Sequence, residues 1–469
     1  MLKKIISKAL VALMLIGAAA GCTPNSTPSS QAASSAASVA GSSPVTSPES
    51  ESTQSASSIS LVFWHSMGGQ GGEAIDKMVA DFNALDNGIE VVAQFQGAYD
   101  DAVTKLQSVS GTEAAPDIMQ LYDIGTRWMI DSGNAVPMQD YIEKDGWDIS
   151  QIEPNIAGYY SVDGRLNSMP FNSSTPIMYY NKDAFAAAGL DPNAPPANWE
   201  ELAAASAKLT RTENGEMLYG FTLRVYGWFF EQYMSKQGLR YADNGNGREA
   251  LAQSVEFDKN GGGVNLLTKW NALYEQGLLG NMGRDDAAIT NAFGAEKTFI
   301  IFGSTASLSS ITQAVGGSFE IGTGKLPDLD AGVNGGVSIG GGSLWMMNKG
   351  NDENKMATWE FIKYMVEPEV QVYWHKQTGY FPISIKAYEL AEMHEHLAAN
   401  PQFQTAIDQL HASPVDARGA LLGVFTEARQ TVEQNIETML AGDMTPEAAV
   451  AEMAKSINSS IEKYNIANS

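Results

Sequence analysis

Few side chains in this sequence could serve as catalytic nucleophiles, general bases or soft metal ligands. The chain has five histidines and one cysteine, which excludes cysteine-based zinc sites, iron–sulfur clusters and intramolecular disulfides. His394 and His396 form the densest metal-like group, but residues two apart on a helix do not share a face. No H-E-x-x-H or P-loop motif occurs. The sequence therefore favours a binding protein over an enzyme, with no catalytic residue, no metal ion and no cofactor.

The charge balance narrows the kind of partner. The 469 residues include 29 Lys and Arg against 54 Asp and Glu, a formal net charge of -25. Nucleic acids and anionic membrane surfaces are bound through clustered Lys and Arg, so neither is expected to bind the folded part. The chain also has 9 Trp, 17 Tyr and 17 Phe, which pack in cores but can stack on sugars and polyols. Composition excludes two classes of partner and leaves the ligand unnamed.

The N-terminal segment has the pattern of an export signal. Three lysines precede an apolar run at residues 9–20, which is too short to span a membrane comfortably. Small residues then lead to Cys22, and this arrangement resembles the lipobox of bacterial lipoproteins. We expect residues 1–21 to be removed as a signal peptide and Cys22 to carry the lipid. An ordinary secreted protein with a free thiol is the alternative.

Residues 22–58 are expected to form a flexible tether between this lipid and the folded part. Of the 36 residues from Thr23 to Ser58, 28 are Ser, Thr, Pro or Ala, and none is Lys or Arg. Such a composition cannot bury enough apolar surface to offset the entropy of ordering the chain. The protein is thus expected at the outer face of the cell membrane, attached only through its N-terminus.

The folded part, residues 59–469, alternates between strand and helix patterns. Apolar runs predict strands, and apolar residues spaced three or four apart predict helices. This alternation indicates an α/β fold with two lobes, followed by a mainly helical part after Phe403. Ligands of such folds bind where strand ends and helix starts converge, in the crevice between lobes. The expected strands are Ile59–His65, Ile89–Phe95, Asp117–Leu121, Ile177–Asn181 and Thr298–Phe302, and the expected helices Glu73–Leu85, Asp100–Val109, Lys182–Ala188, Trp199–Leu209 and Thr358–Val366.

Four motifs in the folded part resemble one family closely. They are FWHSM at 63–67, PFNSSTP at 170–176, GGGSLW at 340–345 and WHKQTGYFPI at 374–383. All four occur in the same order in the sn-glycerol-3-phosphate-binding proteins of bacterial ABC importers. These belong to the extracellular solute-binding proteins of the maltose-binding type.

The resemblance implies a type II periplasmic-binding-protein fold, with a hinge and a cleft between the lobes. We expect lobe 1 to comprise about residues 59–168 plus 303–345. Lobe 2 is then expected to comprise about residues 172–300 plus 348–469, with the chain crossing between the lobes.

The resemblance also implies a ligand site, carried over one residue at a time. Asp123 stands where the family has Glu, which holds the glycerol hydroxyls. One of two cleft tryptophans in the family matches Trp228, and the other is replaced by Val225 or Tyr226. Because these departures lie away from the inferred phosphate donors, a phosphorylated glycerol remains the first expectation. The implied ligand-binding residues are Tyr99, Asp123, Ser174, Trp228, Ser304, Gly341, Tyr380 and Arg429.

The chemistry of this set suits a phosphate ester. Arg429 offers a planar fork that matches phosphate oxygens, and hydroxyls add further donors. Gly341 lets a backbone N–H approach the ligand without a Cβ, and Ser304 opens a predicted helix N-terminus, where anions are favoured. Each residue also has an ordinary interpretation: Ser174 as a turn residue, Ser304 as an N-cap, Gly341 as a turn glycine, and Arg429 as a surface ion-pair residue.

The resemblance therefore implies a receptor that captures sn-glycerol-3-phosphate or a glycerophosphodiester. It would act as a monomer and deliver the ligand to the membrane permease of an ABC importer. A receptor for a sugar or oligosaccharide is the alternative within the same class. A secreted glycoside hydrolase or phosphodiesterase is the alternative from another class.

Overall fold

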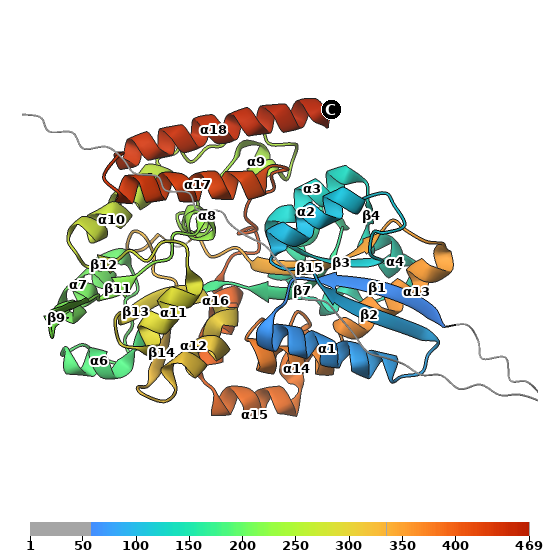
Figure 1. Ribbon diagram of the computed structural model, residues 1–469, viewed down its shortest axis with the longest axis horizontal. Helices are drawn as coiled ribbons and strands as arrows, with labels where there is room; N and C mark the ends of the chain where they lie inside the picture. Colours follow the sequence, from blue (N-terminus) through green and yellow to red (C-terminus); the bar gives the residue numbers. More distant parts are fainter. Residues whose placement is uncertain (1–57, 334, 469) are drawn as a thin grey trace, which may run out of the picture. The chain divides into compact units, whose positions relative to one another are not determined.

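Two mixed β-sheets organise the folded part of the protein, which a computed structural model describes over residues 58–333 and 335–468 (Figure 1). The first sheet has the strand order β2-β1-β3-β15-β4, with β7 paired to β15. The three N-terminal strands run parallel, and β15 runs antiparallel to its neighbours. Its strands are β1 (Ile59–His65), β2 (Ile89–Phe95), β3 (Ile118–Tyr122), β4 (Ala135–Val136), β7 (Met169–Ser174) and β15 (Gly340–Met347).

Helices cover both faces of this sheet. Because its central strands are buried on both faces, their residues are almost continuously apolar. Every residue of β3 is buried, as expected for a parallel strand covered on both faces. On α1, Ile75, Met78 and Phe82 form the buried stripe that the helical spacing predicts. The helices of this lobe are α1 (Gly69–Asn83), α2 (Tyr99–Val109), α3 (Thr126–Ser132), α4 (Met138–Asp145), α5 (Pro154–Tyr160), α13 (Asp352–Met365), α14 (Pro368–Thr378) and α15 (Ala391–Ala399).

The second sheet has the strand order β12-β11-β13-β8-β14. Strand β8, which lies between β13 and β14, is antiparallel to both of these neighbours, and all six of its residues are buried. Its strands are β8 (Pro176–Asn181), β11 (Phe221–Thr222), β12 (Leu279–Gly280), β13 (Ile300–Ser304) and β14 (Ile321–Lys325). The hairpins β5–β6 (Ser161–Val162, Arg165–Leu166) and β9–β10 (Arg211–Glu213, Glu216–Leu218) lie outside both sheets.

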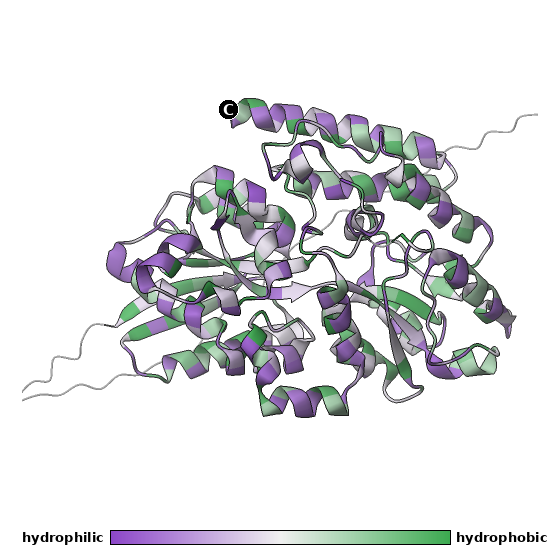
Figure 2. Ribbon diagram, turned by 180° about the vertical axis from the view of Figure 1, so that it is seen from behind, coloured by the Kyte–Doolittle hydropathy of each residue, from purple (hydrophilic) through white to green (hydrophobic). Residues whose placement is uncertain are grey.

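The remaining helices belong to the second lobe, where α17 packs against both α18 and α8. Figure 2 shows apolar residues along the strands and polar residues on the outward faces of the helices. Among the described residues, no helix is both long and apolar enough to cross a bilayer. These helices are α6 (Lys182–Ala187), α7 (Trp199–Leu209), α8 (Gly227–Lys236), α9 (Asp243–Gly247), α10 (Gly262–Glu275), α11 (Asp286–Gly294), α12 (Leu308–Val315), α16 (Gln402–Ala412), α17 (Phe425–Leu440) and α18 (Pro446–Ala467).

The α/β fold with two lobes is confirmed, but parts of two segments lie in the other lobe from the one expected, whereas β15 and the helices α16 to α18 lie in the expected lobes. We expected residues 303–345 in lobe 1, yet β14 pairs with β8 in the second sheet. We expected residues 348–469 in lobe 2, yet α13 packs on β1 and β15, and α14 packs on α1. Strand pairing and helix packing, not chain order, decide these memberships. The expected signal peptide and tether lie outside the described residues.

The two sheets are joined most directly at Thr175, the one residue between β7 and β8. The Thr175 carbonyl accepts a hydrogen bond from the Thr305 N–H at 2.9 Å. Its hydroxyl accepts one from Gln409 Nε2 at 3.1 Å, and the same nitrogen donates to the Pro176 carbonyl at 2.7 Å. The crossing is therefore held by bonds from two further segments of the chain.

Candidate ligand-binding site

One wall of the candidate site is a set of neutral side chains from the first lobe. Asn172, on β7, donates a hydrogen bond from Nδ2 to the Tyr99 hydroxyl at 2.8 Å. Its Oδ1 accepts a hydrogen bond from Gln120 Nε2 at 2.9 Å, which fixes the amide orientation. The Tyr99 ring stacks on Tyr122 with ring centroids 5.1 Å apart. We call Tyr99, Asn172 and Tyr380 the neutral wall.

Tyr380 completes this wall from the loop after α14. Its ring stacks on Trp374, with centroids 5.6 Å apart and planes 7° from parallel. Burial raises the pKa of the Tyr380 hydroxyl, although hydrogen bonds with Asn172 and Tyr99 oppose part of that rise. Burial likewise raises the pKa of Tyr99 well above its ordinary value. Both hydroxyls therefore stay protonated at neutral pH and can donate to a ligand.

The glycine run at the start of β15 lets strands and side chains approach closely behind this wall. Gly341 has φ +98°, and a Cβ there would lie 1.8 Å from the Asn172 carbonyl oxygen. A Cβ at Gly340 would meet the Trp228 indole at 2.8 Å. Trp228 thus reaches from α8 to β15, and its buried Nε1 has no hydrogen-bond partner. A polar ligand atom is one way to satisfy such a buried donor.

Arg429 dominates the opposite wall. Its side chain is only 6% exposed on α17, and it donates from Nε and Nη2 to the two Glu231 carboxylate oxygens at 2.8 and 2.7 Å. Nη1 donates to the Tyr226 hydroxyl at 3.1 Å. Nη2 also lies 3.4 Å from Asp123 Oδ2, across from the first lobe. The expectation that the departures from the family lie away from the phosphate donors is therefore wrong, because both Asp123 and Tyr226 contact Arg429. We call Arg429, Glu231 and Asp123 the ionic wall.

The carboxylates of the ionic wall are shifted toward their neutral forms. Burial raises the pKa of Glu231 to about 7, while Arg429 opposes the rise and Asp123 and Glu433 add to it. Burial also raises the pKa of Asp123, again with Arg429 opposing. The physical cause in both cases is removal of a charged group from water, which nearby positive charge only partly offsets.

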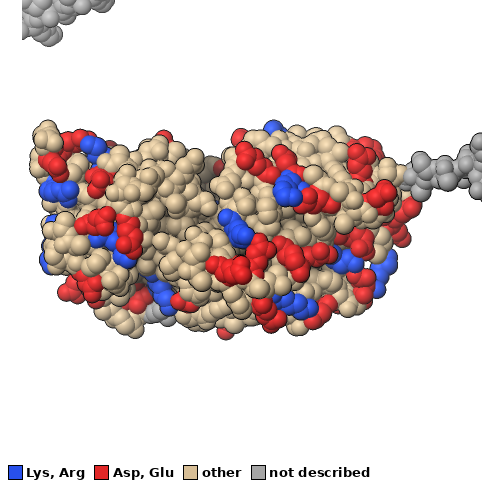
Figure 3. Space-filling view, turned by 90° about the horizontal axis from the view of Figure 1, so that it is seen from below, with Lys and Arg blue, Asp and Glu red and all other residues tan. Residues whose placement is uncertain are grey.

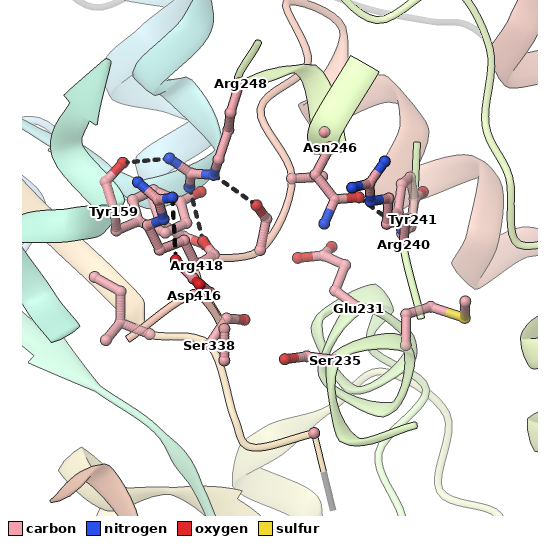
Figure 4. A pocket seen from close by; sticks show the side chains of 18 of the residues that line it. Tyr159, Glu231, Ser235, Arg240, Tyr241, Asn246, Arg248, Ser338, Asp416 and Arg418 are labelled. Atoms are coloured by element: carbon pink, nitrogen blue, oxygen red, sulfur yellow. Dashed lines mark hydrogen bonds and ion pairs between the residues drawn. The ribbon is translucent and has the colours of Figure 1, made fainter. Parts of the chain in front are cut away.

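Two cavities lie on either side of this ion pair. The larger has a volume of about 600 Å³ and is lined by Asp123 and Glu231. Figure 4 shows Glu231 pointing into it from α8, opposite Ser338 and Arg418. The smaller, about 190 Å³, is lined by Arg429. The ion pair therefore stands at the wall of a space larger than a glycerol phosphate needs.

The structure places the two expected serines at the crossing between the sheets. Ser174 is buried at the end of β7, and Ser304 pairs with Pro176 at the start of β8. The Ser304 hydroxyl accepts a hydrogen bond from Ala306 N–H at 3.2 Å and caps a short 3-10 turn. The predicted helix start is thus displaced, because α12 begins only at Leu308.

Contacts link most of the expected ligand-binding residues, and they also draw in two that were not expected. Asn172 lies within the PFNSSTP motif and bonds to Tyr99. Glu231 is an acid within the aromatic stretch WFFEQY of α8. An acid among buried aromatic residues is itself a signal of a paired or functional charge.

Arg248 ties the rim of the larger cavity together. Its guanidinium donates to three backbone carbonyls: Gly419 at 2.8 Å, Tyr159 at 3.0 Å and Arg418 at 2.7 Å. It also lies over the Tyr159 ring, 5.0 Å from the centroid. Burial lowers its pKa to about 10, so it remains charged. Arg248 thus joins α5 of the first lobe to the loop before α17.

Neither of two enzyme-like patterns forms a reactive group. Residues 336–340 read Gly-Val-Ser-Ile-Gly, the spacing of a hydrolase nucleophile elbow. Ser338, however, precedes a strand and accepts a hydrogen bond from Gln232 Nε2 at 3.0 Å, and in the described part of the chain no histidine is hydrogen-bonded to it. Within residues 58–333 and 335–468, no three His, Cys, Asp or Glu side chains are grouped to hold a metal ion.

Sequence comparison gives the class to which this two-lobed fold and site belong. Residues 77–405 match the family of bacterial extracellular solute-binding proteins, so the chain belongs to that family. The family comprises extracellular or periplasmic proteins that bind substrates for ABC importers.

Particular relatives within the family narrow the comparison. The sn-glycerol-3-phosphate-binding periplasmic protein UgpB of Yersinia pseudotuberculosis is 33% identical over 429 residues, covering 89% of this chain and 95% of the relative. The protein of the same name from Escherichia coli K12 is 34% identical over 400 residues, covering 83% and 90%.

Solved structures confirm the fold. UgpB from Mycobacterium tuberculosis, in complex with glycerophosphocholine, aligns with a TM-score of 0.74 and 23% identity, covering 87% of this chain and 100% of the other. The sugar-binding protein MalE from Xanthomonas citri aligns with a TM-score of 0.72 and 20% identity, covering 87% and 98%. At these identities the likeness concerns the fold alone.

Proposed function

We propose that this protein is the receptor of an ABC importer that captures sn-glycerol-3-phosphate or a glycerophosphodiester. The observation that carries the proposal is Arg429, a buried cation that faces Asp123 from the other lobe. Arg429 supplies donors for phosphate oxygens, while the neutral wall supplies hydroxyls and an amide for the glycerol. Curated relatives named for sn-glycerol-3-phosphate binding support the same ligand class.

In this proposal the two lobes close over the ligand about the crossing at Thr175. Ligand binding biases the population toward the closed form, which docks on the permease. The protein acts as a monomer and catalyses nothing itself. Lipid attachment at Cys22 holds the protein at the outer face of the membrane. Metabolic labelling with a fatty acid tests this attachment, and we expect the Cys22→Ala variant to lose the label.

Calorimetric titration tests the ligand directly. The soluble folded part is titrated with sn-glycerol-3-phosphate, glycerophosphocholine, maltose and free glycerol. Saturable binding of a phosphate ester, with none of maltose, is expected. Binding of maltose and of neither phosphate ester would contradict the proposed ligand and leave the fold standing.

A sugar receptor is the second candidate, favoured by one specific observation. Two carboxylates, Glu231 and Asp123, already accompany Arg429, so the ionic wall carries no excess positive charge. Carboxylates and aromatic rings suit the hydroxyls and apolar faces of a neutral sugar. The maltose arm of the titration separates the two candidates.

A further inference from the structure

The Arg429 guanidinium already has a carboxylate partner where a phosphate would bind. Glu231 accepts hydrogen bonds from Nε and Nη2 at 2.8 and 2.7 Å, the forked geometry that a phosphate also uses. The Glu231 side chain is 12% exposed and the Arg429 side chain 6%, so both charged groups are largely shielded from water. A phosphate cannot use these two donors while Glu231 holds them.

The charge around Arg429 makes simple addition of an anion unfavourable. Arg429 supplies one positive charge, and Glu231 and Asp123 supply two negative charges when ionised. Glu433, on the same helix as Arg429, further disfavours ionised Glu231. A bound phosphate would add another negative charge to a buried group, where like charges repel strongly. When a phosphate binds, one of the two carboxylates must therefore take up a proton or move away from Arg429.

Glu231 has both room and a direction in which to move. Its carboxylate lines the cavity of about 600 Å³, and Figure 4 shows it projecting into that space from α8. Asp123, by contrast, sits in the short turn after β3, where backbone N–H groups hold its charge. Both carboxylates line this cavity, but Glu231 makes the shorter contacts to the guanidinium, and Asp123 is the one held by backbone N–H groups.

Resting on the proposed function, we infer that Glu231 is an internal competitor of the ligand phosphate. It occupies Arg429 in the empty site and leaves it, taking up one proton from solvent, when a phosphate ester binds. Glu231 is therefore a specificity-determining residue, because a ligand must replace a carboxylate that the protein itself supplies.

The pH dependence of binding follows from this exchange. The pKa of Glu231 is about 7 in the empty site, and loss of Arg429 raises it further. Below pH 7 Glu231 is already protonated, so affinity is nearly constant. Above pH 7 each binding event takes up a proton, so affinity falls as pH rises, by up to about tenfold per pH unit.

Other titratable groups near Glu231 bear on this dependence. Burial raises the pKa values of the neighbouring tyrosines, so they stay neutral through the range of the experiment. Asp123, whose pKa is also raised, is the remaining group that could contribute protons, and the Glu231 variant separates the two. The charged and titratable groups packed closest to Glu231 are Arg429 and Glu433 on α17, Asp123 after β3, Tyr226 before α8, Tyr241 after α8 and Tyr159 on α5. Across the cavity, the further charged side chains of the lining are Asp163, Arg240, Arg248, Glu249, Asp416 and Arg418.

Glycerophosphocholine is the appropriate probe, because its phosphodiester does not titrate between pH 6 and 8.5. Calorimetry in two buffers of different ionisation heat gives the number of protons taken up. For the wild type we expect uptake that approaches one proton at pH 8 and an affinity that falls from pH 7 to 8.5. This measurement requires no variant, so it does not depend on the folding of one.

Glu231→Gln then removes the competitor's charge at nearly constant size. At pH 8 we expect this variant to bind at least about tenfold more tightly than the wild type and to take up no proton. The matched control is Glu427→Gln, which removes an exposed carboxylate from α17 close to Arg429 and is expected to match the wild type.

The outcomes separate the inference from the proposed function. Binding by the wild type without proton uptake, together with no gain in Glu231→Gln, would overturn the role of Glu231 and leave the ligand assignment intact. Absence of binding by both proteins at every pH would overturn both. Binding by Glu231→Gln alone would support both.

Discussion

The neutral wall and the ionic wall, which meet near Asp123, are prepared for a ligand in opposite ways. In the neutral wall, Asn172 is fixed by Gln120 and already bonded to Tyr99, so its geometry exists before a ligand arrives. In the ionic wall, the main ligand donors of Arg429 are occupied by Glu231. Recognition of hydroxyls can therefore rely on preorganisation, whereas recognition of charge requires exchange of an internal partner.

The largest expected effect breaks the neutral wall from behind. In Gly341→Ala, the new Cβ meets the Asn172 carbonyl at 1.8 Å at a residue with φ +98°. Strain and overpacking together should lower the free energy of unfolding by about 4 kcal/mol, measured by urea denaturation.

The matched control is Gly442→Ala, because Gly442 has φ +85° with no atom near its absent Cβ. It isolates the backbone term, and we expect a loss of only about 1 kcal/mol. Equal losses in the two variants would show that the contact with Asn172 is unimportant.

The next effect uses pH to act on the support of the neutral wall. His375 Nδ1 lies 2.7 Å from the Tyr380 carbonyl oxygen, and burial lowers its pKa to about 4. A depressed histidine pKa contributes stability that is complete above the unfolded value of about 6.5 and is lost as pH falls toward 4. We expect the free energy of unfolding to fall by about 3 kcal/mol across this window.

Denaturation of His375→Asn at several pH values checks this expectation. The variant should lose the part of the pH dependence that His375 contributes, about 3 kcal/mol between pH 6.5 and 4, whereas His394→Asn, at an exposed position on α15, should keep it. His65 and His396, whose pKa values burial also lowers, contribute equally in both variants. An unchanged slope in His375→Asn would refute the assignment. The expected loss of slope would show that the support of the neutral wall weakens in acid, whereas ligand binding at the ionic wall weakens above pH 7.

Removing the cation should break the ionic wall alone. Arg429→Gln should weaken binding of sn-glycerol-3-phosphate by at least about 100-fold, because the ligand charge loses its hydrogen-bonded partner. Calorimetry measures the change, with Arg211→Gln, an exposed substitution, as the control. Retained affinity would exclude Arg429 from the site.

The double variant Arg429→Gln with Glu231→Gln sharpens this result. In the single variant two buried carboxylates lose their cation, so part of any stability loss comes from unpaired charge. The double variant should recover stability without recovering affinity. Recovery of affinity would mean that phosphate binding depends on other donors.

The smallest expected effect removes one hydroxyl from the neutral wall. Tyr380→Phe should weaken ligand binding about fivefold, the consequence of one lost neutral hydrogen bond, and the loss should not vary with pH. Tyr373→Phe, on α14 and outside the site, is the matched control. A loss as large as that of Arg429→Gln would remove the distinction between the two walls.

The sequence predicted local structure well, because apolar runs report directly on buried strands and helix faces. PFNSSTP was singled out as a motif, and it spans the end of β7, Thr175 and the start of β8. The lobe boundaries were predicted less well. Whether β14 joins the first or the second sheet depends on pairing with β8, about 140 residues earlier, which no local pattern encodes.

For the candidate site, the sequence offered single residues as expectations but did not offer the pairs that they form. The resemblance implied Arg429 and Asp123, but their separation of 306 positions hid their approach to each other. Glu231 lies 198 positions from Arg429 and was not singled out. The sequence shows Glu231 as an isolated acid in an aromatic helix, but it does not show that Arg429 is its partner.

The crossing at Thr175 has a mechanical consequence for the proposed receptor. With only one residue between β7 and β8, this connection acts as the hinge about which the lobes rotate. At the distant rim, where α18 approaches α3, the Tyr464 hydroxyl donates to Asp131 at 2.8 Å (Figure 1). A small rotation about Thr175 therefore produces a large separation between α18 and α3 at that rim. The Tyr464–Asp131 bond should therefore break early in opening, before the bonds that surround the ligand.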